Sequence, residues 1–185
     1  MTGAYGHLRA HLDDDLPQTE PMHLAFENWR PQDLAVLERA NTGAMTLFLG
    51  GPESPEELSA RRAGWLGFAG HGEGAGCRIE ADGASLGYAG WWSEVHDGQP
   101  VYEVGCSVEP GWQGRGIATW ALNEVVRRAA ASDDPRPLVG YAALGNDASN
   151  ALCARCGFAA RATGVFPSED GDLEVTVWWL EVASR

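Results

Sequence analysis

The most constraining feature of the sequence is a glycine-rich segment between a predicted strand and a predicted helix. The segment, Gly111–Ala118, reads Gly-Trp-Gln-Gly-Arg-Gly-Ile-Ala and follows the alternating run Val101–Val108. After it, apolar residues recur every three or four positions, as on one face of a helix. Glycines at such a junction let main-chain N–H groups turn inward, and the helix dipole adds partial positive charge. The segment therefore predicts a phosphate-binding loop.

Two common phosphate loops do not match this segment. A Rossmann fingerprint needs a third Gly or Ala at position 119, where Thr119 stands, and it needs parallel strands. The strands before Gly111 are instead predicted to be linked by hairpins at Asp82-Gly83 and Asp97-Gly98, which are favoured turn dipeptides. A Walker loop needs a Lys, and the sequence contains none.

The other elements predict a mixed fold with an antiparallel bias. A strand is expected over His23–Trp29, followed by a helix that Pro31 opens. Ser54-Pro55-Glu56-Glu57 has the form of a capping box, so a second helix is expected to run to about Trp65, where a glycine-rich stretch begins. The sequence thus predicts two helices before the central hairpins.

The C-terminal third of the chain adds two strands after another strand and helix. A buried strand is expected over Pro137–Leu144 and a helix over Asp147–Cys156, ended by Gly157. Further strands are expected at Phe158–Phe166 and Leu173–Val182. The predicted order is β-α-α-β-β-β-α-β-α-β-β, an α/β (mixed α+β) fold in three layers, with helices on both faces of a mostly antiparallel sheet.

Composition limits the partners of the protein. The 185 residues carry 26 acidic and 13 basic side chains, and every basic one is Arg, which gives a formal charge of −13. An acidic surface disfavours nucleic acid, and no apolar run is long enough to span a membrane. Residues 1–21 are expected to form a flexible N-terminal arm before a single domain at 22–185. Four Cys and no recognisable leader suggest the cytoplasm. No metal site is expected, because Cys153-Ala-Arg-Cys156 lacks a second ligand pair.

Two motifs resemble those of a known superfamily. Gln113-x-x-Gly116-x-Ala118, after Glu-Val-Gly-Cys-Ser-Val-Glu-Pro, resembles motif A of the GNAT N-acetyltransferases. Asn146-x-x-Ser149 followed by Gly157-Phe158 resembles their motif B, and the likeness is nearest to the RimJ/RimL-like subgroup. The resemblance implies acetyl transfer from the cosubstrate acetyl-CoA to a primary amine, of a protein N-terminus or a small cationic metabolite, in a ternary complex. It also makes a homodimer plausible.

The resemblance implies a role for each matching residue. Main-chain groups of Cys106 and Val108 would pair with the pantetheine arm of the cofactor, and the Val108 N–H would stabilise the oxyanion. Asn146 and Ser149 would contact the cofactor or simply cap a helix. The pyrophosphate would be held by the N–H groups of Gln113, Gly114, Arg115, Gly116, Ile117 and Ala118.

The catalytic residues are predicted by strand alternation and by comparison with the family. Tyr102, Val104, Cys106 and Val108 form one apolar face, which leaves Glu103 beside the small residues Gly105 and Ser107 on the other. Glu103 is therefore the expected general base, against the alternative of a structural or solvated carboxylate. Glu94 and His96 are weaker candidates.

Many family members place a tyrosine acid where this chain has Cys153. A thiol with an ordinary pKa could replace that acid, or the departing thiolate could need none. The substitution also leaves two alternatives open: a non-catalytic acyl-CoA-binding or regulatory module, and a transferase that uses another acyl-CoA.

Overall fold

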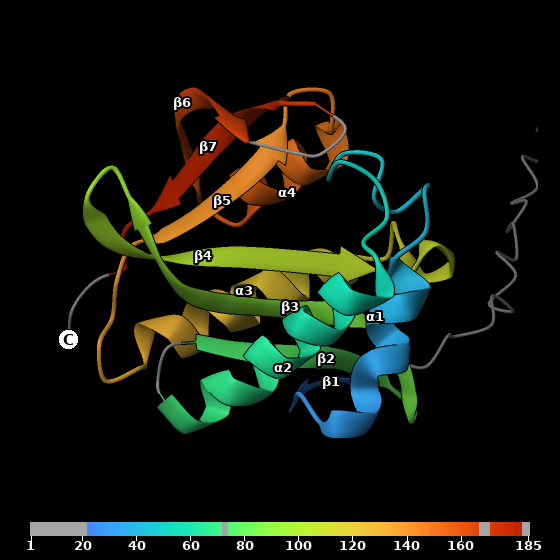
Figure 1. The fold of residues 1–185 in the computed structure, drawn as a ribbon. Coiled ribbons are helices and arrows are strands. Elements are labelled where there is room, and N and C mark those ends of the chain that lie inside the picture. Colours follow the sequence, from blue (N-terminus) through green and yellow to red (C-terminus); the bar gives the residue numbers. More distant parts are fainter. Residues whose placement is uncertain (1–21, 72–73, 167–170, 183–185) are drawn as a thin grey trace, which may run out of the picture.

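The structure is a computed structural model that describes residues 22–71, 74–166 and 171–182. The arm predicted at 1–21 lies outside these residues. Within them, seven strands form one sheet in the order β1-β2-β3-β4-β5-β7-β6, and helices cover both faces (Figure 1). The predicted order of strands and helices is confirmed. None of the helices in the described ranges is long and apolar enough to cross a membrane.

The first strand and two helices follow the predicted start signals. β1 (Leu24–Asn28) leads through a 3₁₀ turn to α1 (Leu34–Ala40), and α2 spans Pro55–His71. The capping box of α2 is present, since the Ser54 N–H donates to Glu57 Oε2 at 2.6 Å and the Glu57 N–H donates to Ser54 Oγ at 3.2 Å. This reciprocal pair satisfies two N–H groups at the start of the helix.

The second helix is longer than predicted. It continues past Gly64 and Gly67 although each glycine costs a helix interior about 1 kcal/mol relative to alanine. Leu58 and Trp65 on the inner side of α2 are buried against Trp29 and Tyr88. This packing outweighs the low helix propensity, so the predicted end near Trp65 is wrong.

The centre of the sheet is built from two tight hairpins. β2 (Gly74–Ala81), β3 (Ala84–His96) and β4 (Gln99–Val108) pair antiparallel in sequence order. Both central residues of each turn have positive φ, 49° and 79° at Asp82-Gly83 and 50° and 79° at Asp97-Gly98. These are the angles that a type I′ turn requires, so the predicted hairpins are confirmed.

The rest of the chain extends the sheet from the other edge of β4. α3 (Ile117–Ala130) is followed by β5 (Leu138–Ala143), α4 (Asp147–Arg155), β6 (Ala159–Phe166) and β7 (Leu173–Leu180). β5 is parallel to β4, whereas the other neighbouring pairs are antiparallel. α4 ends as predicted at Gly157 (φ 86°), where the Phe158 N–H donates to Cys153 O and the Gly157 N–H donates to Ala154 O.

Two hydrophobic cores lie on opposite faces of the sheet. α3 packs Ile117, Ala121 and Val125 into the core that contains Trp91. α1 and α2 pack Leu37 and other side chains into the core on the opposite face, against which Trp92 lies. The adjacent residues Trp91 and Trp92 therefore point to opposite faces, as strand alternation requires.

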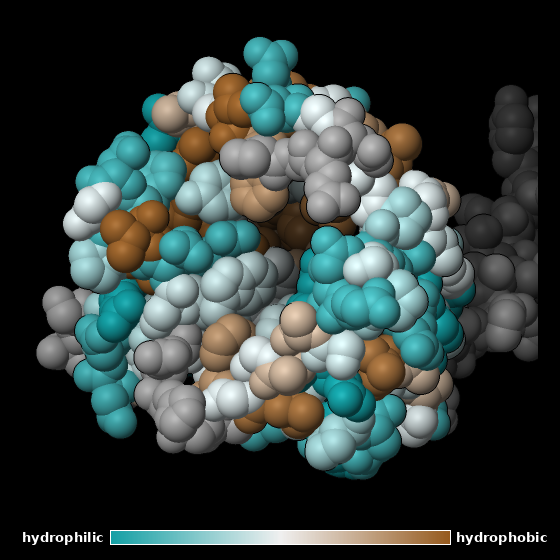
Figure 2. All heavy atoms as spheres, viewed as in Figure 1, coloured by the Kyte–Doolittle hydropathy of each residue, from teal (hydrophilic) through white to brown (hydrophobic). Residues whose placement is uncertain are grey.

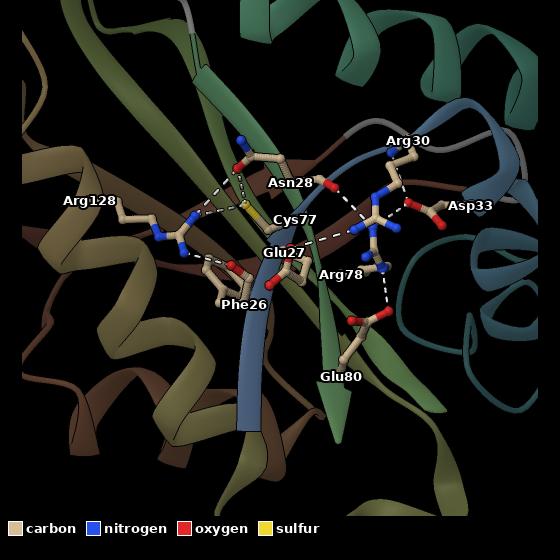
Figure 3. A network of polar contacts seen from close by, with 9 residues as sticks. All are labelled: Phe26, Glu27, Asn28, Arg30, Asp33, Cys77, Arg78, Glu80 and Arg128. Atoms are coloured by element: carbon tan, nitrogen blue, oxygen red, sulfur yellow. Dashed lines mark hydrogen bonds and ion pairs between the residues drawn. The ribbon is translucent and has the colours of Figure 1, made fainter. Parts of the chain in front are cut away.

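A buried arginine joins β1, β2 and the start of α1 (Figure 3). The Arg78 side chain is only 2% exposed. Its Nη1 donates to Asn28 O and to Asp33 Oδ2, both at 3.0 Å, and its Nε donates to Glu80 Oε1 at 2.6 Å. The bond from Arg78 is the main reason that the pKa of Glu80 is lowered. This charge is thus paired on two sides by carboxylates.

Candidate active site

The sheet opens between β4 and β5. β4 has ten residues and β5 has six, but the two strands pair only at Tyr102 with Leu138 and at Glu103 with Val139. Beyond these two pairs the strands diverge (Figure 1). The space-filling view shows a hollow over this region with a hydrophobic floor (Figure 2). The C-terminal half of β4 therefore has a strand neighbour on one side only.

Main-chain hydrogen bonds show which groups of β4 face this gap. The Glu109 N–H donates to Leu86 O on the β3 side, whereas the Tyr102 N–H donates to Pro137 O on the β5 side. Residues of a strand present their main-chain groups to alternate sides, and the β3–β4 register has no shift. The N–H groups of Cys106 and Val108 therefore point into the gap, as their predicted role requires. The Val108 carbonyl already accepts from Gln113 Nε2 at 2.8 Å, which leaves it one lone pair.

The glycine-rich loop presents free N–H groups at the end of β4. Gly114 and Gly116 have φ of 74° and 79°, a conformation that favours glycine. Across the described ranges, no main-chain or side-chain acceptor is bonded to any N–H group from Gly114 to Ala118. The Gln113 N–H, which was predicted to join them, instead donates to Pro110 O at 3.3 Å. Five of the six predicted donors are thus available, at the N-terminus of the 14-residue helix α3.

This arrangement fits an anionic group of the size of a diphosphate. Unpaired N–H groups at a helix N-terminus carry partial positive charge and bind phosphate oxygens. A Cβ at Gly111, Gly114 or Gly116 would meet no atom within 4 Å, so the loop surface is open. Arg115 lies over the Trp112 ring at 4.8 Å and donates to Gly111 O at 3.2 Å. Its guanidinium therefore stays close to the loop.

The second motif forms a helix cap. Asn146 precedes α4, and its Oδ1 accepts from the Ser149 N–H at 3.1 Å. The prediction that Asn146 and Ser149 cap a helix is therefore confirmed, and the cap uses Asn146 Oδ1 and the Ser149 N–H. Among the described residues, Asn146 Nδ2 has no hydrogen-bond partner. A contact between Asn146 and a ligand would therefore use this NH₂ group.

Glu103 lies where the strands separate, and no cationic side chain among the described residues pairs with it. It is opposite Trp92 on β3 and Val139 on β5, so it shares their face of the sheet. The pKa of Glu103 is raised to about 7, mainly by burial and to a smaller extent by the nearby Glu94, while a hydrogen bond from Trp92 opposes the shift. The Trp92 ring also covers Gly105, where a Cβ would lie 2.9 Å from it. A carboxyl group with this pKa can accept a proton at neutral pH.

Cys153 occupies a different environment from the one expected of an acid. Its side chain is buried, and a Cβ placed on Gly140 would lie 3.7 Å from its Sγ. Burial, with a smaller effect of Cys156, raises the pKa of Cys153 to about 11. The premise of an ordinary thiol pKa is therefore wrong. A group that holds its proton this firmly is a weak acid toward a departing thiolate, so its environment disfavours the predicted role.

Sequence reasoning missed Tyr141. It lies on β5 two residues after Val139, and thus on the face of Glu103. Its hydroxyl is 2.9 Å from Nδ1 of His96, a residue rated only a weak candidate. Tyr141 was hidden in an apolar run, and the only available signal was the alternation that separates Val139 and Tyr141 from their neighbours.

A separate recess lies between α1, the segment that connects α1 to α2, and β3. Its lining includes Asn41, Thr46 and Tyr88. Glu53 and Arg61, also in the lining, form an ion pair at 2.7 Å. The charges of this recess are therefore largely compensated, in contrast to those around Glu103.

Comparison with known proteins agrees with this geometry. Residues 23–159 match the acetyltransferase (GNAT) domain family, and the chain belongs to this family. A search of curated proteins finds no match. The ribosomal L7/L12 alpha-N-protein acetyltransferase RimL in complex with coenzyme A has the same fold (TM-score 0.73, 16% identity, 88% of this chain and 96% of that one). At this identity the likeness concerns the fold alone.

Two further solved structures share the fold. Spermidine N-acetyltransferase from Vibrio cholerae, in complex with CoA and spermine, gives a TM-score of 0.71 at 16% identity, over 87% of this chain and 96% of that one. The Microcin C7 self immunity acetyltransferase MccE, in complex with acetyl-CoA and AMP, gives 0.70 at 13% identity, over 86% and 92%.

Proposed function

We propose that this acetyltransferase moves the acetyl group of acetyl-CoA to a primary amine. The observation that carries the proposal is the continuity of two features: the unpaired edge of β4 and the free N–H groups of Gly114–Ala118. Together they present main-chain donors and acceptors of the kind that a phosphorylated, amide-containing arm can use. The solved relatives that bind CoA or acetyl-CoA support this choice of donor.

In the proposed reaction the residues of the site hold two substrates and move one proton. The loop N–H groups hold the diphosphate, and the Cys106 and Val108 main chain holds the arm, so the thioester lies near Glu103. The neutral amine nitrogen bonds to the thioester carbon, and the carbon–sulfur bond breaks, so that coenzyme A departs as a thiolate and takes a proton from solvent. Glu103 takes the proton that the amine loses, and the Val108 N–H donates to the thioester oxygen. The Cys153 thiol stays protonated and takes no part.

The acceptor is proposed to be an amine on a cationic small molecule or on a protein N-terminus. Glu103 and Glu94 lie on one face near the divergence, and each raises the pKa of Tyr141. Uncompensated negative charge attracts an ammonium group. One solved relative is an alpha-N-protein acetyltransferase of a ribosomal protein, and another is a spermidine N-acetyltransferase, so each kind of amine has a relative named for it.

Release of free CoA tests the proposal. Acetyl-CoA would be incubated with peptides, polyamines and simple primary amines, and acetyl-CoA binding would be measured by calorimetry. Turnover with at least one amine is the expected result. Binding without turnover for every amine would favour the non-catalytic acyl-CoA-binding module, which the environment of Cys153 keeps open. Absence of both binding and turnover would exclude both functions.

A pair of glycine variants tests the loop separately. Gly116→Ala and Gly83→Ala change residues with the same φ of 79°, and a Cβ at either would meet no atom within 4 Å. Both variants should lose a similar stability, on the order of 1 kcal/mol, because alanine disfavours this φ. Only Gly116→Ala should weaken acetyl-CoA binding. Equal affinity in the two variants would contradict the proposed diphosphate site.

A further inference from the structure

A line of polar side chains on the Glu103 face of the sheet leads from Tyr141 to solvent. Tyr141 lies on β5 on the same face of the sheet as Glu103, and its hydroxyl is 2.9 Å from His96 Nδ1. His96 Nε2 is 3.7 Å from Asp97 Oδ2. The side chain of His96 is 23% exposed and that of Asp97 is 96% exposed. These contacts lead from Tyr141 to the surface at the β3–β4 turn, and Glu103, whose charge raises the pKa of Tyr141, lies on the same face of the sheet.

The surroundings define where the protons of this line reside. The groups that face Tyr141 are Glu103 from β4, Glu94 and His96 from β3, and Asp97 from the turn. Burial raises the pKa of Tyr141, and the three carboxylates raise it further, so its hydroxyl stays protonated at neutral pH. In the His96 tautomer that carries its proton on Nε2, this nitrogen lies 3.7 Å from Asp97 Oδ2. His96 Nδ1 is then free to accept the Tyr141 O–H.

The aromatic neighbours hold this pair in place. The His96 ring lies 6.0 Å from the Tyr141 ring and 5.9 Å from the Trp179 ring. On its other side, Tyr141 contacts the Phe166 ring at 5.8 Å. Rings packed from several strands restrict the rotation of the two side chains, which a proton-transfer path requires.

We propose that Tyr141 and His96 carry the amine proton from Glu103 to solvent, a role that rests on the proposed function. Protonated Glu103 releases its proton, through solvent water, to the Tyr141 oxygen while the Tyr141 hydroxyl gives its own proton to His96 Nδ1. His96 releases the Nε2 proton to Asp97 or water. Tyr141 ends unchanged, Glu103 is again a carboxylate, and exchange with water restores the His96 tautomer. One proton leaves per acetyl group transferred, and no bond other than those to hydrogen changes.

Chemical rescue tests this relay in the full-length protein. Turnover would be measured for the parent, Tyr141→Phe and His96→Gln in dilute buffer and with increasing imidazole. We expect kcat of both variants to fall roughly tenfold with little change in KM, because the relay acts on proton transfer rather than on binding. Imidazole in solution should restore most of the lost kcat and leave the parent almost unchanged. Loss of packing alone would not be restored in this way.

Tyr102→Phe is the matched control. Its hydroxyl donates to Asp134 O at 3.1 Å, and its ring faces the α3 side of the sheet. This variant should show no dependence on imidazole.

Each outcome decides a separate point. A parent without turnover for any amine would overturn the proposed function and the relay with it. If the parent is active and Tyr141→Phe has the same rate, the relay is overturned and the proposed function stands. The same conclusion follows if Tyr141→Phe is slower and imidazole does not restore its kcat. If Tyr141→Phe fails to fold in a thermal unfolding control, His96→Gln decides by the same criteria.

Discussion

Two ionisable side chains on the same face of the sheet have opposite surroundings. Arg78 on β2 is opposite Tyr88, and Glu103 on β4 is opposite Trp92, and both of these aromatic residues belong to the α1–α2 side. Arg78 has Asp33 and Glu80 as partners, whereas the charged neighbour of Glu103 within the described part of the chain is another carboxylate, Glu94. The charge of Arg78 is therefore neutralised by its neighbours, whereas a charge on Glu103 is not.

This difference separates a structural group from a reactive one. A buried charge with fixed partners keeps its protonation state over a wide pH range, so it can join strands but cannot exchange protons. A carboxyl group without a counter-charge has its two protonation states close in free energy near neutral pH. A perturbed pKa beside an opening in the sheet is therefore a stronger sign of function than burial of a charge.

The largest effect should be the loss of unfolding free energy when Arg78 is removed from its ion pairs. Arg78→Met leaves Asp33 and Glu80 without their partner, and removal of one member of a buried ion pair costs about 3–5 kcal/mol of unfolding free energy. Urea unfolding would measure this loss. Arg127→Met is the control, since Arg127 is 64% exposed and pairs with Glu124 on the surface, where less than about 1 kcal/mol is expected. Equal losses would contradict the contrast.

The pH dependence of stability should show the uncompensated group. Below the pKa of an unfolded glutamate, near 4.5, Glu103 is neutral in both states. Between that value and about 7 the unfolded chain releases the proton while the folded protein keeps it. Stability therefore falls as pH rises through this window, by up to about 3 kcal/mol, and stays reduced above it. Urea unfolding of Glu103→Gln at pH 5 and pH 8 should lack this loss.

The same substitution should affect catalysis. Glu103→Gln removes the proposed base and keeps the shape of the side chain, so turnover should fall by roughly a hundredfold with unchanged acetyl-CoA affinity. Steady-state rates and calorimetry would measure the two quantities. A variant that keeps the parent rate would show that Glu103 is only a buried carboxyl group.

Glu94→Gln should sharpen the comparison. Glu94 raises the pKa of Glu103, so its removal should move the acidic limb of the kcat/KM profile, near pH 7 in the parent, to lower pH. The direction follows because one repulsive charge is lost. A limb that stays in place would indicate that burial alone sets the pKa of Glu103.

The smallest effect is expected at Cys153. Its thiol has a pKa of about 11 and remains protonated, so Cys153→Ala should change kcat by less than about twofold. Cys77→Ala, at a fully buried position in the same core, controls for the cost of a core cavity. A large loss of kcat for Cys153→Ala alone would restore the acid role that the structure disfavours.

The fold was largely predictable because its signals are local. Turn dipeptides, the capping box and the apolar stripe of α3 each act over a few residues and fixed the order of elements. The end of α2 was mispredicted because Trp65 packs against residues distant in sequence. The conformation of the glycine-rich loop depends on its own glycines, so the N–H groups of Gly114–Ala118 are free as predicted. The Gln113 N–H is the exception, because it donates to Pro110 O within the turn.

The chemistry of the site was less predictable. Alternation along β4 predicted that Glu103 shares a face with the small residues Gly105 and Ser107. Whether a cation lies near its carboxyl group depends on the side chains of the neighbouring strands, which the local sequence does not specify. The Tyr141–His96 contact joins residues 45 positions apart, and no local pattern marks it. Burial of Cys153 likewise depends on the packing of α4 against β5.

The brief pairing of β4 with β5 has a mechanical consequence. Two residue pairs join the β5–β7–β6 part of the sheet to the rest, so this seam has fewer cross-strand bonds than the β3–β4 pair. A molecule seated along the free edge of β4 would supply the interstrand contacts that the polypeptide omits. Binding of this molecule would then stabilise the association of the β5–β7–β6 strands with the rest of the sheet. The binding could be measured as a rise in the melting temperature of the protein.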